Sequence, residues 1–212
     1  MSHKLRAVVF DVGHVLFDWH PRHLYARLIP DPAALEDFVT RVVTFDWHSQ
    51  HDAGRPFAET SAELSALYPE HAGLIAQYGP RFSESIPGPI PGSHDIVAAL
   101  DAAGVPLFAL TNFSAEFWPP FRAPNAALFD RFCDILVSGE ERLVKPDPAI
   151  FALAMRRFGL APGEALFVDD RPENVAAGED AGLIGHVFRD APALRTDLVA
   201  RGLLRDDPQP IS

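Results

Sequence analysis

The sequence of 212 residues lacks features that mark several classes of protein. It has a single cysteine, Cys133, so no disulfide can form within the chain; we expect a reducing, cytoplasmic setting, with Cys133 as a small buried hydrophobic side chain. No apolar run approaches the length of a membrane span, and Asp11 interrupts the first apolar run too early for a signal peptide. The chain also contains no internal repeat and no low-complexity segment.

Positive charge is scarce as well. Acidic residues number 29 against 18 Lys and Arg, which gives a net charge of −11, and the basic residues form no cluster. We therefore expect no nucleic-acid partner, and the lack of an apolar span gives no reason to expect a membrane partner. A phosphorylated substrate would need a local positive centre, such as a metal ion. Apolar residues make up 48% of the chain, which is enough for a sizeable core.

Five short apolar segments predict buried strands. They lack the alternation of polar and apolar residues found in half-exposed strands, which is typical of a parallel sheet covered on both faces. Helical patterns between them begin at Ser93 (a candidate N-cap), at Asp147–Pro148, near Pro172 and at Ala191. This alternation predicts an α/β fold with a doubly wound, Rossmann-like parallel sheet. The predicted strands are residues 7–10, 105–110, 135–137, 165–168 and 183–188.

Residues 18–91 interrupt this alternation, because they hold helical patterns (31–42, 57–67 and 74–82) but no strong strand. The segment ends in Pro87–Gly92, where three prolines and two glycines in six residues predict a connector, either a hinge or a rigid turn. We therefore predict two domains, which are a core of residues 1–17 and 92–212 and an inserted helical cap of residues 18–91.

Polar residues follow four of the predicted strands. Because the carboxyl ends of parallel strands meet at one edge of a sheet, we expect these residues to converge there, with Lys145 nearby. Carboxylates in close quarters repel one another and raise each other's pKa unless a cation is present, and oxygen ligands of this kind suit Mg²⁺. The residues are Asp11, Thr111 with Asn112, Ser138 to Glu140, and Asp169 with Asp170.

This set of residues resembles the motifs of the haloacid dehalogenase superfamily of hydrolases, in the subgroup with a helical cap inserted after the first strand. A Thr-Asn or Lys-Pro pair alone carries no information, but four motifs in this order, each at a strand end, are specific. The resemblance covers nearly the whole chain. The motifs are Asp11–Leu16, Leu110–Asn112, Lys145–Pro146, and Val168–Asp170 followed by Asn174.

The resemblance implies a role for each residue. Asp11 would be the nucleophile that forms a covalent aspartyl intermediate, Thr111 would hydrogen-bond the transferring phosphoryl group, and Lys145 would neutralise charge on both. It implies that substrate contacts include Asn112, Gly13 and His14. A Mg²⁺ ion would be held by Asp11, the backbone carbonyl of Gly13, Asp169 and Asp170.

Gly13 departs from the pattern of most phosphatases in this superfamily. They carry a second aspartate at this position, which serves as general acid and base and contributes about 10²–10⁴-fold to the rate. Gly13 therefore implies a slower enzyme, a better leaving group or another proton donor. His14 is one candidate donor; the alternative is a turn residue whose ring packs under the cap.

The leading hypothesis is a Mg²⁺-dependent phosphatase, a phosphoric monoester hydrolase that acts on a small phosphorylated metabolite as a monomer or homodimer. The first alternative is a metal-independent 2-haloacid dehalogenase. Such enzymes lack the second aspartate and place an arginine in the cap, for which Arg41, Arg22, Arg55 and Arg81 are candidates. They tend to replace the acid pair with Ser and Asn, so the two retained acids favour the phosphatase. A catalytically silent binding module is the second alternative, and the retained carboxylates argue against it.

Aromatic residues near the motifs are expected to surround the substrate or to pack the cap. Trp118 is expected to pack at the cap and its interface, although Phe113 and Trp118 both follow Thr111 closely enough to border the crevice and line a substrate pocket. Trp19 and Trp47, like the histidines of residues 18–91, are expected to serve packing, since no pair of histidines has the context of a zinc site.

Overall fold

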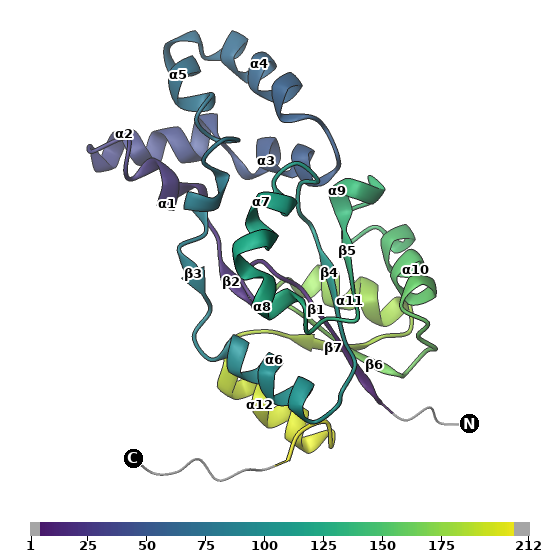
Figure 1. The fold of residues 1–212 in the computed structure, drawn as a ribbon. Helices are drawn as coiled ribbons and strands as arrows, with labels where there is room; N and C mark the ends of the chain where they lie inside the picture. Colours follow the sequence, from purple (N-terminus) through teal and green to yellow (C-terminus); the bar gives the residue numbers. More distant parts are fainter. Residues whose placement is uncertain (1–4, 206–212) are drawn as a thin grey trace, which may run out of the picture.

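The computed structural model describes residues 5–205, so the predicted core residues 1–4 and 206–212 lie outside the described range. A five-stranded parallel sheet forms its centre (Figure 1). Strand β1 (Ala7–Phe10) lies in the middle between β4 (Leu107–Thr111) and β6 (Ala165–Asp169). The outer strands are β5 (Asp134–Val137) and β7 (Ile184–Val187), and all four pairings are parallel. The predicted doubly wound α/β sheet is confirmed.

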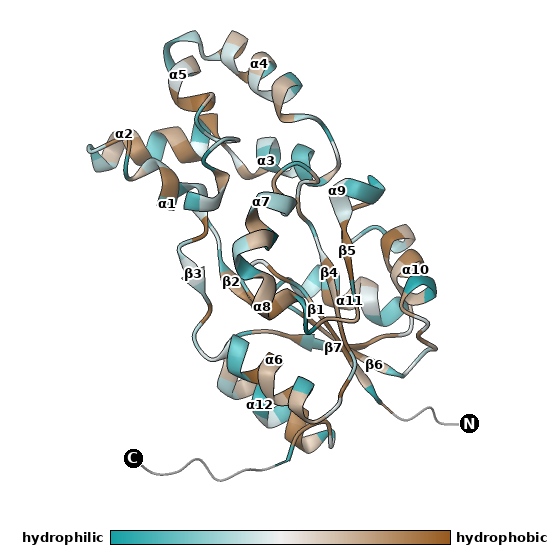
Figure 2. Ribbon diagram, viewed as in Figure 1, coloured by the Kyte–Doolittle hydropathy of each residue, from teal (hydrophilic) through white to brown (hydrophobic). Residues whose placement is uncertain are grey.

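Helices cover both faces of the sheet. Val8 and Phe10 of β1 belong to one apolar cluster, while Ala7 and Val9 belong to the other, which explains why the strand is apolar throughout. The first cluster includes side chains of α6 (Ser93–Ala102), α7 (Trp118–Arg122), α8 (Ala126–Phe129) and α12 (Ala191–Ala200). The second is covered by α10 (Pro148–Arg157) and α11 (Pro172–Asp180). Figure 2 shows the central strands as the most hydrophobic part of the ribbon.

Strand β7 is half-buried along its length, so the expectation that it is covered on both faces was wrong. The reason is its place at the edge of the sheet, with β6 as its only neighbouring strand. Cys133 is exposed, and the expectation of a buried side chain was wrong there too. It lies just before β5, at the opposite edge, where a side chain points to solvent.

The predicted starts of α10 and α11 are confirmed. The Asp147 side chain accepts a hydrogen bond from the backbone N–H of Ala149, and Pro172 is the first residue of α11. The prediction that Ser93 caps α6 was wrong. Gly92 holds the cap position in a left-handed conformation (φ 80°), and the Ser93 hydroxyl instead donates to the carbonyl of Val15 at 2.6 Å. This bond ties α6 to the segment that follows β1.

The helical insert, defined here as residues 18–91, leaves and rejoins the sheet through a short antiparallel ribbon. It pairs β2 (Phe17–Asp18) with β3 (Gly88–Pro89), a feature that the expectation of a segment with no strong strand and a Pro-rich connector did not include. Two residues per strand are too few to leave a pattern in the sequence.

Beyond the ribbon the insert is helical. The helix predicted over residues 57–67 is confirmed as α4 (Phe57–Leu67), and Asp31 caps α2 (Pro32–Asp37), which continues as a π-helical turn (Phe38–Val42). The helix predicted over 74–82 was wrong, because α5 ends at Ile75. Helices α1 and α3 were not predicted. The remaining bounds are α1 (Pro21–Tyr25), α3 (Phe45–Asp52), α5 (Ala72–Ile75) and 3-10 turns at Pro69–His71, Phe82–Ser85 and, after α7, Ala123–Asn125; α9 (Ser138–Glu141) follows β5.

The insert is held together by aromatic packing and touches the core through α3 and the 3-10 turn Phe82–Ser85. Trp47 and Tyr78 are buried with their rings 5.1 Å apart, and Phe82 stacks on Phe117 of the core at 4.6 Å. The Ser138 hydroxyl donates to the backbone carbonyl of Asp52 at 2.6 Å. None of the helices within residues 5–205 is both long and apolar enough to cross a membrane.

Candidate active site

Asp11 lies at the carboxyl end of the central strand. Its backbone N–H continues the pairing of β1 with β6 by donating to the carbonyl of Val168 at 2.8 Å. Its carboxylate accepts a hydrogen bond from the N–H of Val12 at 2.7 Å, and the residue is only 8% exposed. The strand therefore presents one fixed carboxylate oxygen to the backbone and leaves the other for a ligand.

Lys145 bridges two buried carboxylates. Its Nζ lies 3.0 Å from Oδ1 of Asp11 and 2.6 Å from Oδ2 of Asp169. Asn112 fixes the backbone of this lysine, because its amide accepts from the Lys145 N–H at 2.8 Å and donates to the Lys145 carbonyl at 3.0 Å. The Asn112 amide, predicted to contact substrate, is thus occupied in holding the lysine.

Asp169 is fully buried and held by neutral donors besides the lysine. The amide of Asn174 donates to both of its oxygens, at 3.0 and 3.1 Å, and the N–H of Arg171 donates to Oδ1 at 2.9 Å. Asp170, the next residue, is half-buried. Asp11, Asp169 and Asp170 each offer a carboxylate oxygen, and these oxygens all lie within 4.8 Å of one another. Three hard oxygen donors at this spacing fit a Mg²⁺ ion.

The electrostatics of the site favour a bound cation. The pKa of Asp11 is raised to about 7, mainly by burial. Asp169 and Asp170 add to this rise, and Lys145 opposes it. The pKa of Asp170 is raised by burial and by Asp169. Burial opposes the charge of Lys145, but Asp11 and Asp169 outweigh it, so the pKa of the lysine lies above its usual value. One ammonium group therefore does not neutralise three carboxylates.

Thr111 ends β4 beside Asp11, as predicted. Its hydroxyl is buried and has no hydrogen-bond partner among residues 5–205, which leaves it free to donate to a ligand. Gly13 has open space where a Cβ would stand. His14 adopts a left-handed conformation (φ 55°), is exposed, and has its ring 6.0 Å from that of Trp19.

A cavity of about 430 Å³ opens at these strand ends, between the sheet edge and the helical insert; Thr111 and Asp169 are buried beneath it and are not among its described lining residues. Its floor holds Asp11, Gly13, Asn112, Lys145 and Asp170. Most of the remaining wall is aromatic or aliphatic. The apolar lining comprises Val12, Phe17, Trp19, Phe45, Ala53, Phe82, Ile86, Phe113, Phe121 and Val144, and the polar residues of the wall are His14, His48, Ser49, Gln50, Asp52, Arg171 and Asn174.

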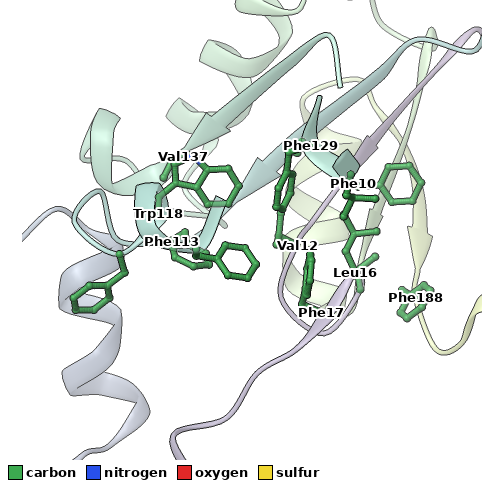
Figure 3. Packing of buried hydrophobic residues seen from close by; sticks show 14 of the residues in the cluster. Phe10, Val12, Leu16, Phe17, Phe113, Trp118, Phe129, Val137 and Phe188 are labelled. Atoms are coloured by element: carbon green, nitrogen blue, oxygen red, sulfur yellow. The ribbon is translucent and has the colours of Figure 1, made fainter. Parts of the chain in front are cut away.

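The predicted place of Phe113 in this wall is seen in the structure, whereas Trp118 is not among the described lining residues. Trp118 packs behind Phe113, with the rings 5.3 Å apart, and against Phe129 (Figure 3). Phe17 stacks with Phe129 at 5.9 Å and meets Phe121 at 5.0 Å. The cavity wall is therefore the surface of the main core and not a separate layer.

The pattern of a known hydrolase family matches residues 5–182, which include all four sets of site residues. The chain belongs to the haloacid dehalogenase-like hydrolases. It is 23% identical over 209 residues to a sesquiterpene phosphatase of Aspergillus oryzae, covering 93% of this chain and 97% of the relative. It is 33% identical over 156 residues to a phosphoserine phosphatase of Thermus thermophilus, covering 73% of this chain and 57% of that protein.

Solved structures of this hydrolase family share the fold. A family enzyme from Bacteroides thetaiotaomicron, in an aspartate-to-alanine variant with magnesium and inorganic phosphate, has a TM-score of 0.66 and 18% identity, over 88% of this chain and 95% of that one. An L-2-haloacid dehalogenase from Xanthobacter autotrophicus with chloropropionic acid covalently bound has a TM-score of 0.61 and 22% identity, over 92% and 83%.

Several residues of this hydrolase's cavity were not predicted. Arg171 follows the acid pair and holds its guanidinium 5.4 Å from the ring of Phe45, and Asp52 brings a further buried carboxyl to the wall. Phe45, His48 and Asp52 lie on one face of α3, and their helical spacing is the only sequence signal that groups them. That spacing does not say which face meets the cavity.

Proposed function

We propose that this hydrolase is a Mg²⁺-dependent phosphatase for a small phosphate monoester whose organic part is largely apolar. The observation that carries the proposal is the arrangement of Asp11, in contact with a buried lysine and within 4.8 Å of two further carboxylates. Asp11 would attack phosphorus and form an aspartyl phosphate, which water then hydrolyses. Thr111 would donate its unpartnered hydroxyl to the transferring group, and Lys145 would offset its charge.

The acid pair supports a metal-dependent phosphatase. Asp11, Asp169, Asp170 and the carbonyl of Gly13 would hold Mg²⁺, which, when bound, would offset the negative charge that separates an anionic nucleophile from an anionic substrate. Asp169 already receives bonds from Lys145 and Asn174, which orient it toward the other two acids. The magnesium and phosphate in the Bacteroides enzyme are consistent with the same use of the fold.

The wall of the cavity supports an apolar organic group. A sugar phosphate would find polar partners only along part of the wall, at residues such as Ser49 and Gln50. Hydroxyl groups that face Phe45, Phe82 and Phe113 would lose hydrogen bonds to water, whereas an apolar chain or ring gains from this contact. The sesquiterpene phosphatase of Aspergillus oryzae, which this chain matches over 97% of its length, agrees with this substrate class. In this proposal the helical insert is the cap predicted from the sequence, and the cytoplasm stays the expected compartment.

The dehalogenase alternative receives less support. Among the described residues, none of the four candidate cap arginines lines the cavity. Each lies in an ion pair at the surface of the insert; these pairs are Arg22 with Glu36, Arg41 with Asp37, Arg55 with Glu63 and Arg81 with Glu84. Arg171 is the one guanidinium in the described wall, and it belongs to the loop after β6.

Phosphate release from benzyl phosphate, an isoprenyl monophosphate and glucose 6-phosphate tests the proposal. We expect turnover of the two apolar esters, a kcat/KM at least about tenfold lower for the sugar phosphate, and loss of activity with EDTA or in Asp11→Asn. Halide release from 2-chloropropionate that persists in EDTA, without phosphate release from any ester, would establish the dehalogenase instead.

A further inference from the structure

Phosphoryl transfer from an alkyl phosphate ester to Asp11 requires a proton for the leaving oxygen, and Gly13 cannot supply one. The other titratable groups on the described cavity wall are few. Lys145 is engaged with Asp11 and Asp169, Asp170 belongs to the candidate Mg²⁺ site, Arg171 is a guanidinium that keeps its proton, and His14 is exposed. Burial lowers the pKa of His48 to about 3, so its ring is neutral, and its Nδ1 lies 2.8 Å from the hydroxyl of Tyr78.

Asp52 has the properties that the missing group needs. It ends α3 with its carboxyl on the cavity wall, and the residue is 6% exposed. Its Oδ2 lies 3.4 Å from Nε2 of His48, while its Oδ1 is buried and has no hydrogen-bond partner in the described part of the chain. Burial raises the pKa of Asp52 well above its usual value, and the charge of Asp11 raises it further against the opposing effect of Lys145. The carboxyl group therefore keeps its proton to a higher pH than an ordinary aspartate does, and its Oδ1 has no partner in the described residues.

The backbone of Asp52 is fixed to the core although the residue belongs to the helical insert. Its carbonyl accepts from the hydroxyl of Ser138 at 2.6 Å, and that hydroxyl also accepts from the N–H of Phe113 at 2.9 Å. Gly54 follows in a left-handed conformation (φ 86°), and a Cβ there would lie only 2.9 Å from the carbonyl oxygen of Gly139. Ser138 and Gly139 at the start of α9, with Ser138 bonded in turn to Phe113, therefore set the position of Asp52.

We propose that Asp52 is the general acid and base of this enzyme, in place of the side chain that Gly13 lacks. This inference rests on the phosphatase function proposed above. As an Asp11 oxygen bonds to phosphorus, the bond from phosphorus to the ester oxygen breaks, and that oxygen takes the proton of Asp52 and leaves as the alcohol. The Asp52 carboxylate then takes a proton from water, the water oxygen bonds to phosphorus, and the bond from phosphorus to Asp11 breaks. Phosphate is released, and the Asp11 carboxylate and protonated Asp52 are regenerated.

Two esters of similar size separate this role from a structural one. Benzyl phosphate releases an alkoxide that needs a proton, whereas 4-nitrophenyl phosphate releases a stable phenolate. For Asp52→Asn we expect kcat/KM to fall by about 10²-fold or more with benzyl phosphate and by less than about tenfold with 4-nitrophenyl phosphate, because kcat/KM reports the steps up to the departure of the leaving group. Asp46→Asn, the same change on the exposed side of α3, leaves both values unchanged.

The wild-type enzyme offers a second measurement that does not depend on the folding of a variant. The ratio of kcat/KM for benzyl phosphate to that for 4-nitrophenyl phosphate falls as pH rises and Asp52 loses its proton. Asp11 and Lys145 across the cavity, and His48 and Tyr78 beside Asp52, act on both esters alike, so the ratio cancels their effect.

The outcomes separate a failure of the proposed phosphatase function from a failure of the role proposed for Asp52. A wild-type enzyme that hydrolyses neither ester would refute the phosphatase. Hydrolysis of both, with a ratio that stays constant with pH or is the same in Asp52→Asn, would leave the phosphatase standing and refute the role of Asp52.

Discussion

Replacing Lys145 by Met removes the cation from between two buried carboxylates and keeps most of the volume of the side chain. The Lys145 side chain is 1% exposed and those of Asp11 and Asp169 are 11% and 0% exposed, so water cannot take its place. Asn112 holds the backbone of residue 145, so the new side chain enters the same space. The change therefore tests charge more than packing.

The expected loss of stability follows from the burial of these groups. Removing one partner of a buried ion pair costs about 3–5 kcal/mol, because the remaining charge is left uncompensated. Protonation limits this cost, since the pKa of Asp11 is already raised to about 7 and rises further without the lysine. A carboxyl group whose pKa is raised in the folded state makes the folded protein less stable as pH rises toward that pKa. The stability difference between wild type and variant is therefore smaller at pH 6 than at pH 8.5.

The same variant loses activity, because the transferring group loses a fixed positive charge. We expect kcat to fall about 10²–10³-fold, the size of effect seen when one preorganised electrostatic partner is removed. Urea denaturation at pH 6 and 8.5 and hydrolysis of benzyl phosphate measure the two effects, with Arg41→Met as the control, since Arg41 is an exposed cation of the insert. An unfolding free energy within about 1 kcal/mol of wild type at pH 8.5, together with more than a third of its kcat, would refute the reasoning.

Three further predictions concern the wall, the insert and the core. Phe45→Ala raises KM for benzyl phosphate about tenfold and changes the unfolding free energy by less than about 0.5 kcal/mol, because Phe45 lines the cavity but is 52% exposed. The control Leu67→Ala changes neither quantity, since Leu67 is 73% exposed and lies away from the cavity. An equal KM in both variants would contradict an apolar substrate wall. Burial lowers the pKa of His51 to about 4, so the unfolded chain binds a proton below about pH 6.5 that the folded protein does not. The stability of His51→Gln relative to wild type therefore rises by up to about 1.4 kcal/mol per pH unit as pH falls from 6.5 to 4.5, and a difference independent of pH would contradict this. Gly178→Ala lowers the unfolding free energy by about 1–3 kcal/mol in urea, since its Cβ would lie 2.7 Å from the Phe167 ring, whereas Ala176→Ser on the exposed side of α11 stays close to wild type.

The sequence was sufficient to predict which strand ends meet at the site. Asp11, Thr111 and Asp169 each end a strand of uninterrupted apolar residues, and parallel pairing then places all three at one edge without further information. Lys145 is predictable from its motif. Its contact with both acids depends on the bonds from Asn112, which no periodicity reveals.

The wall of the site was not predictable in the same way. The place of Asp52 depends on how the helical insert lies over the sheet edge, which is set by contacts such as Phe82 on Phe117 and by the bond from Ser138 to the Asp52 carbonyl. These contacts join residues far apart in the chain, and their side-chain types do not specify their partners. Ser93 shows the same limit at a helix end, because its hydroxyl donates to the carbonyl of Val15, far away in the chain, and does not cap the helix.

The most direct test of the central claim is to find the phosphate on the enzyme. Mixing the wild-type protein with benzyl phosphate and Mg²⁺, quenching in acid within one turnover and sequencing the peptides by mass spectrometry should show phosphate on Asp11, with none in Asp11→Asn. Release of phosphate by an enzyme whose Asp11 is never modified, with turnover retained in Asp11→Asn, would contradict the account.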